Sequence, residues 1–171
     1  IGILSPSYWL DREILSITSK YFTDLGYRLK FGKSNELKWG PFAGLPEQRA
    51  NDIHEMFANS DIDAIFCARG GYGANRVLPL LDYNLIKENP KIFIGYSDIT
   101  AMLTSITQKT SLITFHGPML TSYKDSWVEY NYSLMQRVLS GEKFIKIYSP
   151  DGLETKILKH GIAHGPLWGG H

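Results

Sequence analysis

Short apolar runs alternate along this chain with longer segments in which apolar residues recur every three or four positions. The runs have the length and apolar content of buried strands, and they lie at residues 1–4, 27–31, 63–68, 91–95 and 112–115. The periodic segments indicate amphipathic helices, and they lie at residues 11–25, 46–59, 77–87 and 98–108. Strands that alternate with helices form a mostly parallel sheet with helices on both faces. The expected fold class is therefore α/β.

Glycine and proline mark several boundaries of these elements. Gly26 follows the first helical segment as a C-terminal stop, and Pro46 suits the first turn of the second. Pro79 interrupts the helical pattern of residues 77–87. Between the second strand and the second helix, residues 32–44 are rich in Gly, Pro, Asn and Ser and include two aromatic anchors, which predicts a structured loop.

The last third of the chain has a weaker pattern. Apolar residues at helical spacing from 127 to 138 predict one more helix, and residues 144–148 predict a strand. Residues 149–171 carry Pro and Gly at both ends and have no helical period. We therefore expect an α/β domain over residues 1–148, and over 149–171 the start of a connector toward an absent C-terminal domain. Because Ile1 already lies within an apolar run, we also expect the native N-terminus upstream of it.

Composition narrows the class of protein. A chain of 171 residues fits one domain, and 43% hydrophobic with 20% charged residues excludes disorder, coiled coil and collagen. With 18 Lys and Arg against 17 Asp and Glu, the chain has no long-range field to attract nucleic acid or an acidic membrane. No apolar stretch approaches the roughly 20 residues of a spanning helix, so no membrane anchor is expected. The single cysteine, Cys67, cannot form an internal disulfide, which is compatible with the cytoplasm.

Candidate chemistry lies in the segments that follow the strands, because open parallel sheets bind ligands beyond the carboxyl ends of their strands. Ser97 stands on the turn between the strand 91–95 and the next helix, which is the position of a nucleophile elbow. A serine there projects its hydroxyl above the sheet, and the following N–H can stabilise an oxyanion. The match to G-x-S-x-G is incomplete because Ile99 holds the fifth position, which disfavours an ordinary α/β-hydrolase. On spacing alone, helix capping by Ser97 or Asp98 is the more common role.

Three other features have both a chemical and a structural interpretation. The glycines of the segment 69–73 let backbone approach a ligand, but a plain turn explains them equally well, and the pattern matches no nucleotide-binding motif. Arg69 could bind a carboxylate and His116 could act as a base or contact substrate, although an exposed arginine and a structural histidine are the commoner cases. The histidines of the C-terminal segment have no recognised zinc spacing, so no metal is expected. Cys67 lies in an apolar strand and is expected to be inert.

Four motifs taken together resemble the LD-carboxypeptidase family. They are the opening residues 1–7, R-G-G-Y-G at 69–73, G-Y-S-D-I-T at 95–100 and F-H-G-P-M at 115–119. The resemblance extends to the Gly-Pro-Leu-Trp-Gly-Gly of 165–170 and corresponds to the N-terminal domain of the family and the start of the next. His171 stands where the family typically has Asn, so this position departs from the pattern.

The resemblance implies a site and a reaction. Members are serine hydrolases, and one branch removes the terminal D-alanine of murein tetrapeptides during cytoplasmic cell-wall recycling. Ser97 would be the nucleophile, the N–H of Asp98 and those of Gly70 and Gly71 would form the oxyanion hole, and Arg69 would help to hold the substrate. The Glu and His of the family triad come from the C-terminal domain, so this chain alone is expected not to turn over. No cofactor is implied.

Two alternatives remain open at this stage. The sister branch, the microcin C immunity peptidases, cuts an amide that joins a peptide or amino acid to a nucleotide, and Arg69 favours the carboxypeptidase branch over it. A non-catalytic flavodoxin-like or periplasmic-type domain could instead hold a small anion at the turn of residues 70–73. We further expect a flavodoxin- or Rossmann-like arrangement, a cytoplasmic location, and an apolar face involving Trp127, Tyr148 and Trp168 that permits a homodimer.

Overall fold

The structure is a computed structural model, and it describes residues 1–123, 129–149, 154, 156–167 and 169–170. The strands are β1 (Gly2–Leu4), β2 (Lys30–Phe31), β3 (Ala64–Cys67), β4 (Ile92–Gly95) and β5 (Phe115–His116). The α-helices are α1 (Arg12–Asp24), α2 (Pro46–Ala58), α3 (Tyr83–Glu88), α4 (Thr100–Thr110) and α5 (Glu129–Leu139). Short 3₁₀ turns are η1 (Lys33–Asn35), η2 (Ala74–Arg76), η3 (Leu78–Leu80), η4 (Ser97–Ile99) and η5 (Leu120–Ser122).

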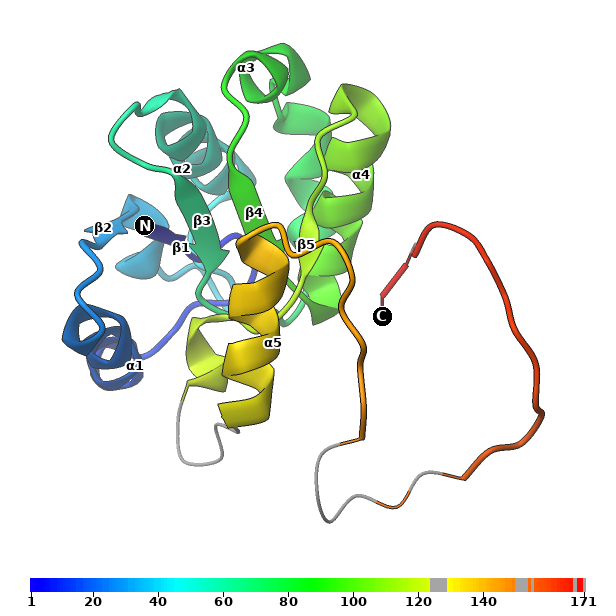
Figure 1. The fold of residues 1–171 in the computed structure, drawn as a ribbon. Coiled ribbons are helices and arrows are strands. Elements are labelled where there is room, and N and C mark those ends of the chain that lie inside the picture. The colour runs from blue at the N-terminus through cyan, green and yellow to red at the C-terminus, as the bar shows by residue number, and fades with distance from the viewer. Residues whose placement is uncertain (124–128, 150–153, 155, 168, 171) are drawn as a thin grey trace. The chain divides into compact units, whose positions relative to one another are not determined.

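The five strands form one parallel sheet in the order β2-β1-β3-β4-β5 (Figure 1). This is the flavodoxin-like strand order, in which the chain reverses its direction of travel between β1 and β3. The predicted α/β class and its doubly wound arrangement are confirmed. Because ligands bind beyond the carboxyl ends of the strands at such a reversal, the topology directs attention to the loops after β1 and β3.

Local signals in the sequence explain where the helices begin and end. The Asp11 carboxylate accepts the Glu13 N–H at the start of α1, and Gly26 beyond its end has a φ of +87°. Pro46 opens α2 as predicted. The periodic segment 77–87 is divided: η3 contains Pro79, and α3 begins only after Asp82, whose carboxylate caps it. The helices α2, α3 and α4 follow one another along one face of the sheet (Figure 1).

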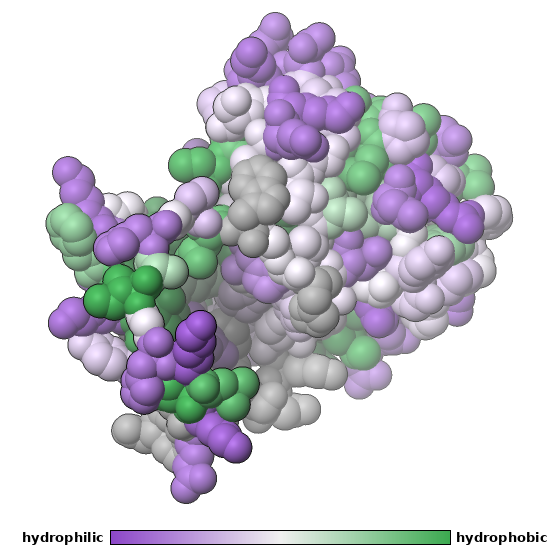
Figure 2. Space-filling model, turned by 90° about the vertical axis from the view of Figure 1, so that its right-hand side faces the viewer, coloured by the Kyte–Doolittle hydropathy of each residue, from purple (hydrophilic) through white to green (hydrophobic). Residues whose placement is uncertain are grey.

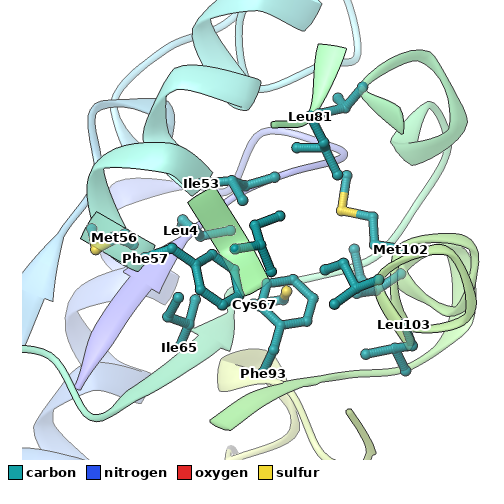
Figure 3. Close-up of a cluster of buried hydrophobic side chains, with 14 of the residues drawn as sticks. Leu4, Ile53, Met56, Phe57, Ile65, Cys67, Leu81, Phe93, Met102 and Leu103 are labelled. Carbon is teal, nitrogen blue, oxygen red and sulfur yellow. The ribbon is translucent and has the colours of Figure 1, made fainter. Parts of the chain in front are cut away.

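A buried apolar cluster lies between the sheet and these three helices (Figure 3). Ile65 from β3 and Ile53 from α2 have no exposed surface, and the rings of Phe57 and Phe93 stack with centroids 5.8 Å apart. Cys67 lies within this cluster, fully buried. Burial raises the pKa of its thiol, which keeps the sulfur protonated and unreactive in the folded protein.

The chain divides into two compact units, residues 1–125 with 169–171, and residues 126–168. The first unit contains the sheet. The second contains α5, where Arg137 pairs with Glu142 at 2.5 Å. The expected boundary at residue 148 stays a prediction.

The strand predicted at residues 144–148 is wrong, since these residues form no regular element. Phe144 is 90% exposed there, and a strand forms only where a neighbour pairs with its backbone. Of the aromatic residues expected on an apolar face, Tyr148 is exposed, whereas Trp127 and Trp168 lie outside the described residues.

Hydrophilic and hydrophobic residues are interspersed over the face drawn in Figure 2. Among the residues that the structure describes, no helix combines the length and the apolar character needed to cross a bilayer.

Candidate active site

Three loops meet beyond the carboxyl ends of adjacent strands. They follow β1 at Ser5–Ser7, β3 at Arg69–Gly73 and β4 at Tyr96–Asp98. Because β1 pairs with β3 and β3 pairs with β4, all in parallel, the three loops lie side by side at the carboxyl end of the sheet. Candidate chemistry was predicted in the loops after β3 and β4, and the fold brings these loops together with the loop after β1.

Ser97 has the backbone of a nucleophile elbow. Its φ is +60°, and among the described non-glycine residues only Ser97 and Ser111 have a positive φ. The left-handed conformation costs a residue with a Cβ about 1–2 kcal/mol. Such strain persists only where the surroundings hold it, and it concentrates at functional sites. Ser111 has the same conformation at the end of α4, away from these loops, so it is the left-handed φ together with the position directly after β4 that marks Ser97 as a candidate nucleophile.

Helix capping does not account for Ser97 or Asp98. Neither η4 nor α4 has a side-chain hydrogen bond at its N-cap. The Ser97 hydroxyl makes no hydrogen bond with any residue that the structure describes. It is half-buried, so it is available to a substrate or to a base.

Gly70 lies directly against Ser97. A Cβ added at Gly70 would lie 3.2 Å from the Ser97 Cβ, 3.4 Å from its Oγ and 3.5 Å from the backbone nitrogen of Asp98. The next glycine, Gly71, has a φ of +132°, and a side chain there would overlap the ring of Tyr8. Position 71 therefore needs glycine for both space and conformation, whereas a side chain at Gly70 would crowd Ser97. The predicted oxyanion-hole residues gather beside the predicted nucleophile.

The Asp98 side chain ties the nucleophile turn to the other two loops. Its Oδ2 accepts hydrogen bonds from the Ser7 hydroxyl at 2.5 Å and from the Ala74 N–H at 2.8 Å. The sequence analysis assigned only the backbone N–H of Asp98 and gave Ser7 no role. No sequence signal would have paired them, since they are 91 residues apart.

A buried arginine, Arg49 of α2, lies beneath the same loops. Its Nη1 donates to the carbonyls of Pro6 at 2.9 Å and Gly73 at 3.1 Å, and its side chain has no exposed surface. Burial, followed by the positive charge of Arg76, lowers the pKa of Arg49. The sequence analysis missed Arg49, although an arginine four residues before Ile53 lies on the apolar face of its helix, which is a signal in itself.

The two predicted substrate contacts occupy different places. The half-buried Arg69 guanidinium lies 5.6 Å from the centroid of the Tyr8 ring and has no ion pair among the described residues. His116 is exposed in β5, where it pairs with Gly95 of β4, and its ring stands edge-on to Tyr96 at 6.2 Å. It makes no hydrogen bond with Ser97, so the structure does not join them as base and nucleophile.

Other candidate sites are absent from this part of the molecule. No group of three or more His, Cys, Asp or Glu side chains within the described ranges could hold a metal ion. A surface hollow of about 600 Å³ is lined by residues of α1 and of the segment 29–36 and by none of the residues above. The loops around Ser97 are therefore the candidate site.

Several known proteins resemble this chain in sequence. A family model described as the LD-carboxypeptidase N-terminal domain matches residues 1–117. A probable murein peptide carboxypeptidase of Bacillus subtilis is 41% identical over 122 residues, which cover 71% of this chain and 38% of that protein. The microcin C7 self-immunity protein MccF of Escherichia coli is 45% identical over 95 residues, covering 56% of this chain and 28% of that protein.

Solved structures show the same fold. MccF in complex with aspartyl sulfamoyl adenosine superimposes with a TM-score of 0.80 at 32% sequence identity, over 92% of this chain and 52% of that one. The chain thus spans well under half the length of the curated relatives it matches. From the matched model, the relatives and the shared fold, the chain belongs to the LD-carboxypeptidase family.

Proposed function

We propose that this chain carries the nucleophile of a serine peptidase that cleaves the L,D-peptide bond to the terminal D-alanine of murein tetrapeptides. The observation that carries the proposal is the left-handed Ser97 after β4, in contact with Gly70. A domain that only held a ligand would have no need for a strained serine whose hydroxyl has no described partner.

The proposed reaction proceeds through an acyl-enzyme. The Ser97 Oγ attacks the carbonyl carbon and loses its proton to a general base, and the carbonyl oxygen becomes an oxyanion. The N–H groups of Asp98 and of Gly70 or Gly71 stabilise that charge. The C–N bond then breaks, D-alanine leaves with a proton returned to its amine, and water hydrolyses the ester. The resemblance assigns the base to a His–Glu pair outside this chain.

Arg69 is the proposed substrate contact. A guanidinium presents a planar fork of donors that matches a carboxylate, and this one has no described acid competing for it. His116, exposed at the end of the neighbouring strand, is proposed as a second contact rather than as the base. We place the reaction in the cytoplasm, with a small peptide as partner and neither nucleic acid nor membrane.

A second candidate is an immunity-type peptidase that acts on aminoacyl or peptidyl nucleotides. It is favoured by the 45% identity to MccF and by the fold shared with its aspartyl sulfamoyl adenosine complex. Arg69 favours the murein reaction. Both candidates use the same nucleophile and differ in the group that leaves.

The test is release of D-alanine from a murein tetrapeptide by the natural gene product and by this 171-residue chain, with Ser97→Ala as the control in each. The proposal expects release by the gene product and none after Ser97→Ala. Cleavage of an aminoacyl sulfamoyl adenosine without D-alanine release would establish the second candidate instead. Silence on both substrates would favour a binding domain.

A further inference from the structure

Two peptide segments at the site are joined to each other twice. They are Pro6–Ser7 after β1 and Gly73–Ala74 after β3. Arg49 bridges the carbonyls of Pro6 and Gly73 through one nitrogen, Nη1. Asp98 bridges the next residue of each segment through one oxygen, accepting from the Ser7 hydroxyl and the Ala74 N–H. A cation from α2 and an anion from the nucleophile turn therefore fasten the same two loops at adjacent residues.

Arg49 is poorly suited to a purely stabilising role. It is fully buried, yet its Nε and Nη2 have no hydrogen-bond partner among the residues that the structure describes. Its guanidinium lies 5.3 Å from the centroid of the Phe42 ring, and that of Arg76 lies 5.2 Å from the same centroid, which adds a like charge nearby. A buried charge with incomplete hydrogen bonding is commonly less stable than an apolar side chain of similar size. The position of Arg49 therefore requires another explanation.

The conformation of Ser97 explains why a buried arginine is placed here. A left-handed residue is strained, so the segments around it must be held in place. Asp98 is the next residue along the chain, so its two hydrogen bonds anchor the peptide that leaves Ser97. Gly70 touches Ser97, and the loop that contains Gly70 ends at Gly73, whose carbonyl Arg49 holds. The strained turn is thus secured both directly and through the loop packed against it.

We propose that Arg49 and the carboxylate of Asp98 are positioning residues for the nucleophile: they hold the loops after β1 and β3 against Ser97 and fix its reactive backbone. The effect of these residues on catalysis rests on the proposed function, whereas their effect on the backbone conformation of Ser97 does not. Neither side chain is assigned a contact with substrate. They act through Pro6, Ser7, Gly73 and Ala74.

The structural part is tested by NMR on this chain, without any substrate. The ¹³Cα and ¹³Cβ shifts of Ser97 report its backbone conformation, and Ser7 and Arg49 are too distant in sequence to change them as chain neighbours. We expect Ser7→Ala and Arg49→Met to move the Ser97 shifts away from their left-handed values. Ser7→Ala removes one oxygen atom, so it keeps the test valid if Arg49→Met does not fold. Unchanged Ser97 shifts in folded Ser7→Ala would overturn the proposal.

The catalytic part is tested by kinetics on the natural gene product. Asp98→Asn keeps an oxygen where both hydrogen bonds end, whereas Asp98→Ala removes it. We expect kcat to fall about tenfold or more in Asp98→Ala and Arg49→Met with KM changed less than about threefold, since small displacements of reacting groups cost rate rather than binding. Asp98→Asn should restore kcat to within about threefold of the parent.

A matched control is Asp52 on the same helix as Arg49. Like the Asp98 carboxylate it accepts two hydrogen bonds, but it is buried and both donors are backbone N–H groups, of Lys33 at 3.0 Å and Ser34 at 2.5 Å. Asp52→Asn should lower the melting temperature and leave kcat unchanged. A loss of kcat in Asp52→Asn equal to that of Asp98→Ala would contradict the positioning role. If the parent cleaves neither substrate, the proposed function fails while the NMR result still decides the structural part.

Discussion

Replacing Ser97 by glycine should stabilise the protein relative to replacing it by alanine. Both changes remove a hydroxyl that has no described hydrogen-bond partner, so they differ only in the Cβ. At a φ of +60° that Cβ costs about 1–2 kcal/mol. Glycine in turn lowers the free energy of unfolding by about 0.5–1 kcal/mol, because it gives the unfolded chain greater conformational freedom. At the centre of these ranges, the balance favours Ser97→Gly over Ser97→Ala by about 0.8 kcal/mol.

The assay is urea denaturation of both variants, supported by melting temperatures, for which 1 kcal/mol corresponds to about 2–4 °C in a chain of this size. Ser111, with a φ of +63°, is a matched position outside the site, and glycine should exceed alanine there too. Ser16 is exposed within α1, where glycine should be less stable than alanine by about 1 kcal/mol. If glycine is less stable than alanine at position 97, as expected at position 16, then the backbone of Ser97 is not left-handed and the nucleophile-elbow argument fails.

Further predictions concern the glycine turn, the substrate contact and the buried thiol. Gly71→Ala should cost about 1–3 kcal/mol of unfolding free energy, because it adds a clash to a strained φ; Gly26→Ala, with open space around a φ of +87°, should cost less. In the natural gene product, Arg69→Ala should raise KM for the tetrapeptide about tenfold or more through loss of a charge-assisted hydrogen bond, and an unchanged KM would remove Arg69 from the site. Because burial raises the pKa of Cys67, the unfolded chain loses that proton first as pH rises, so stability falls by up to about 1.4 kcal/mol per pH unit above about pH 8.5. Cys67→Ala should remove this difference, and parallel pH curves for parent and variant would refute the assignment. Sedimentation should show self-association that increases with concentration, and a monomer at all concentrations would count against the expected homodimer.

The fold could be predicted from the sequence where an element is determined by its own residues. The apolar run at 63–68 corresponds to β3, and the helical period of 46–59 corresponds to α2. No predicted end is more than one residue from the observed end. Strands at the sheet edges were predicted too long, since residues 27–31 contain only the two-residue β2. The strand predicted at 144–148 failed for a related reason: its apolar residues fit a strand, but pairing depends on a neighbour that a local pattern cannot show.

The candidate site also has a part that could be predicted from local sequence and a part that could not. Gly95, Ser97 and the adjoining helix are close in sequence, so the elbow could be predicted from the chain alone. Arg49 and the Asp98 carboxylate could not be assigned, because their partners come from loops that only the strand order brings together. A charged residue on an otherwise apolar helix face was the available signal for Arg49.

The central claim is that Ser97 forms an ester with the substrate, and intact-mass analysis of the natural gene product stopped during turnover of a murein tetrapeptide tests it most directly. The account predicts an added mass equal to the tetrapeptide less D-alanine, because the proton displaced from Oγ leaves with the D-alanine, and it places this mass on the digestion peptide that contains Ser97. Ser97→Ala should carry no adduct and release no D-alanine. An adduct on another residue, or D-alanine release by Ser97→Ala, would contradict the account.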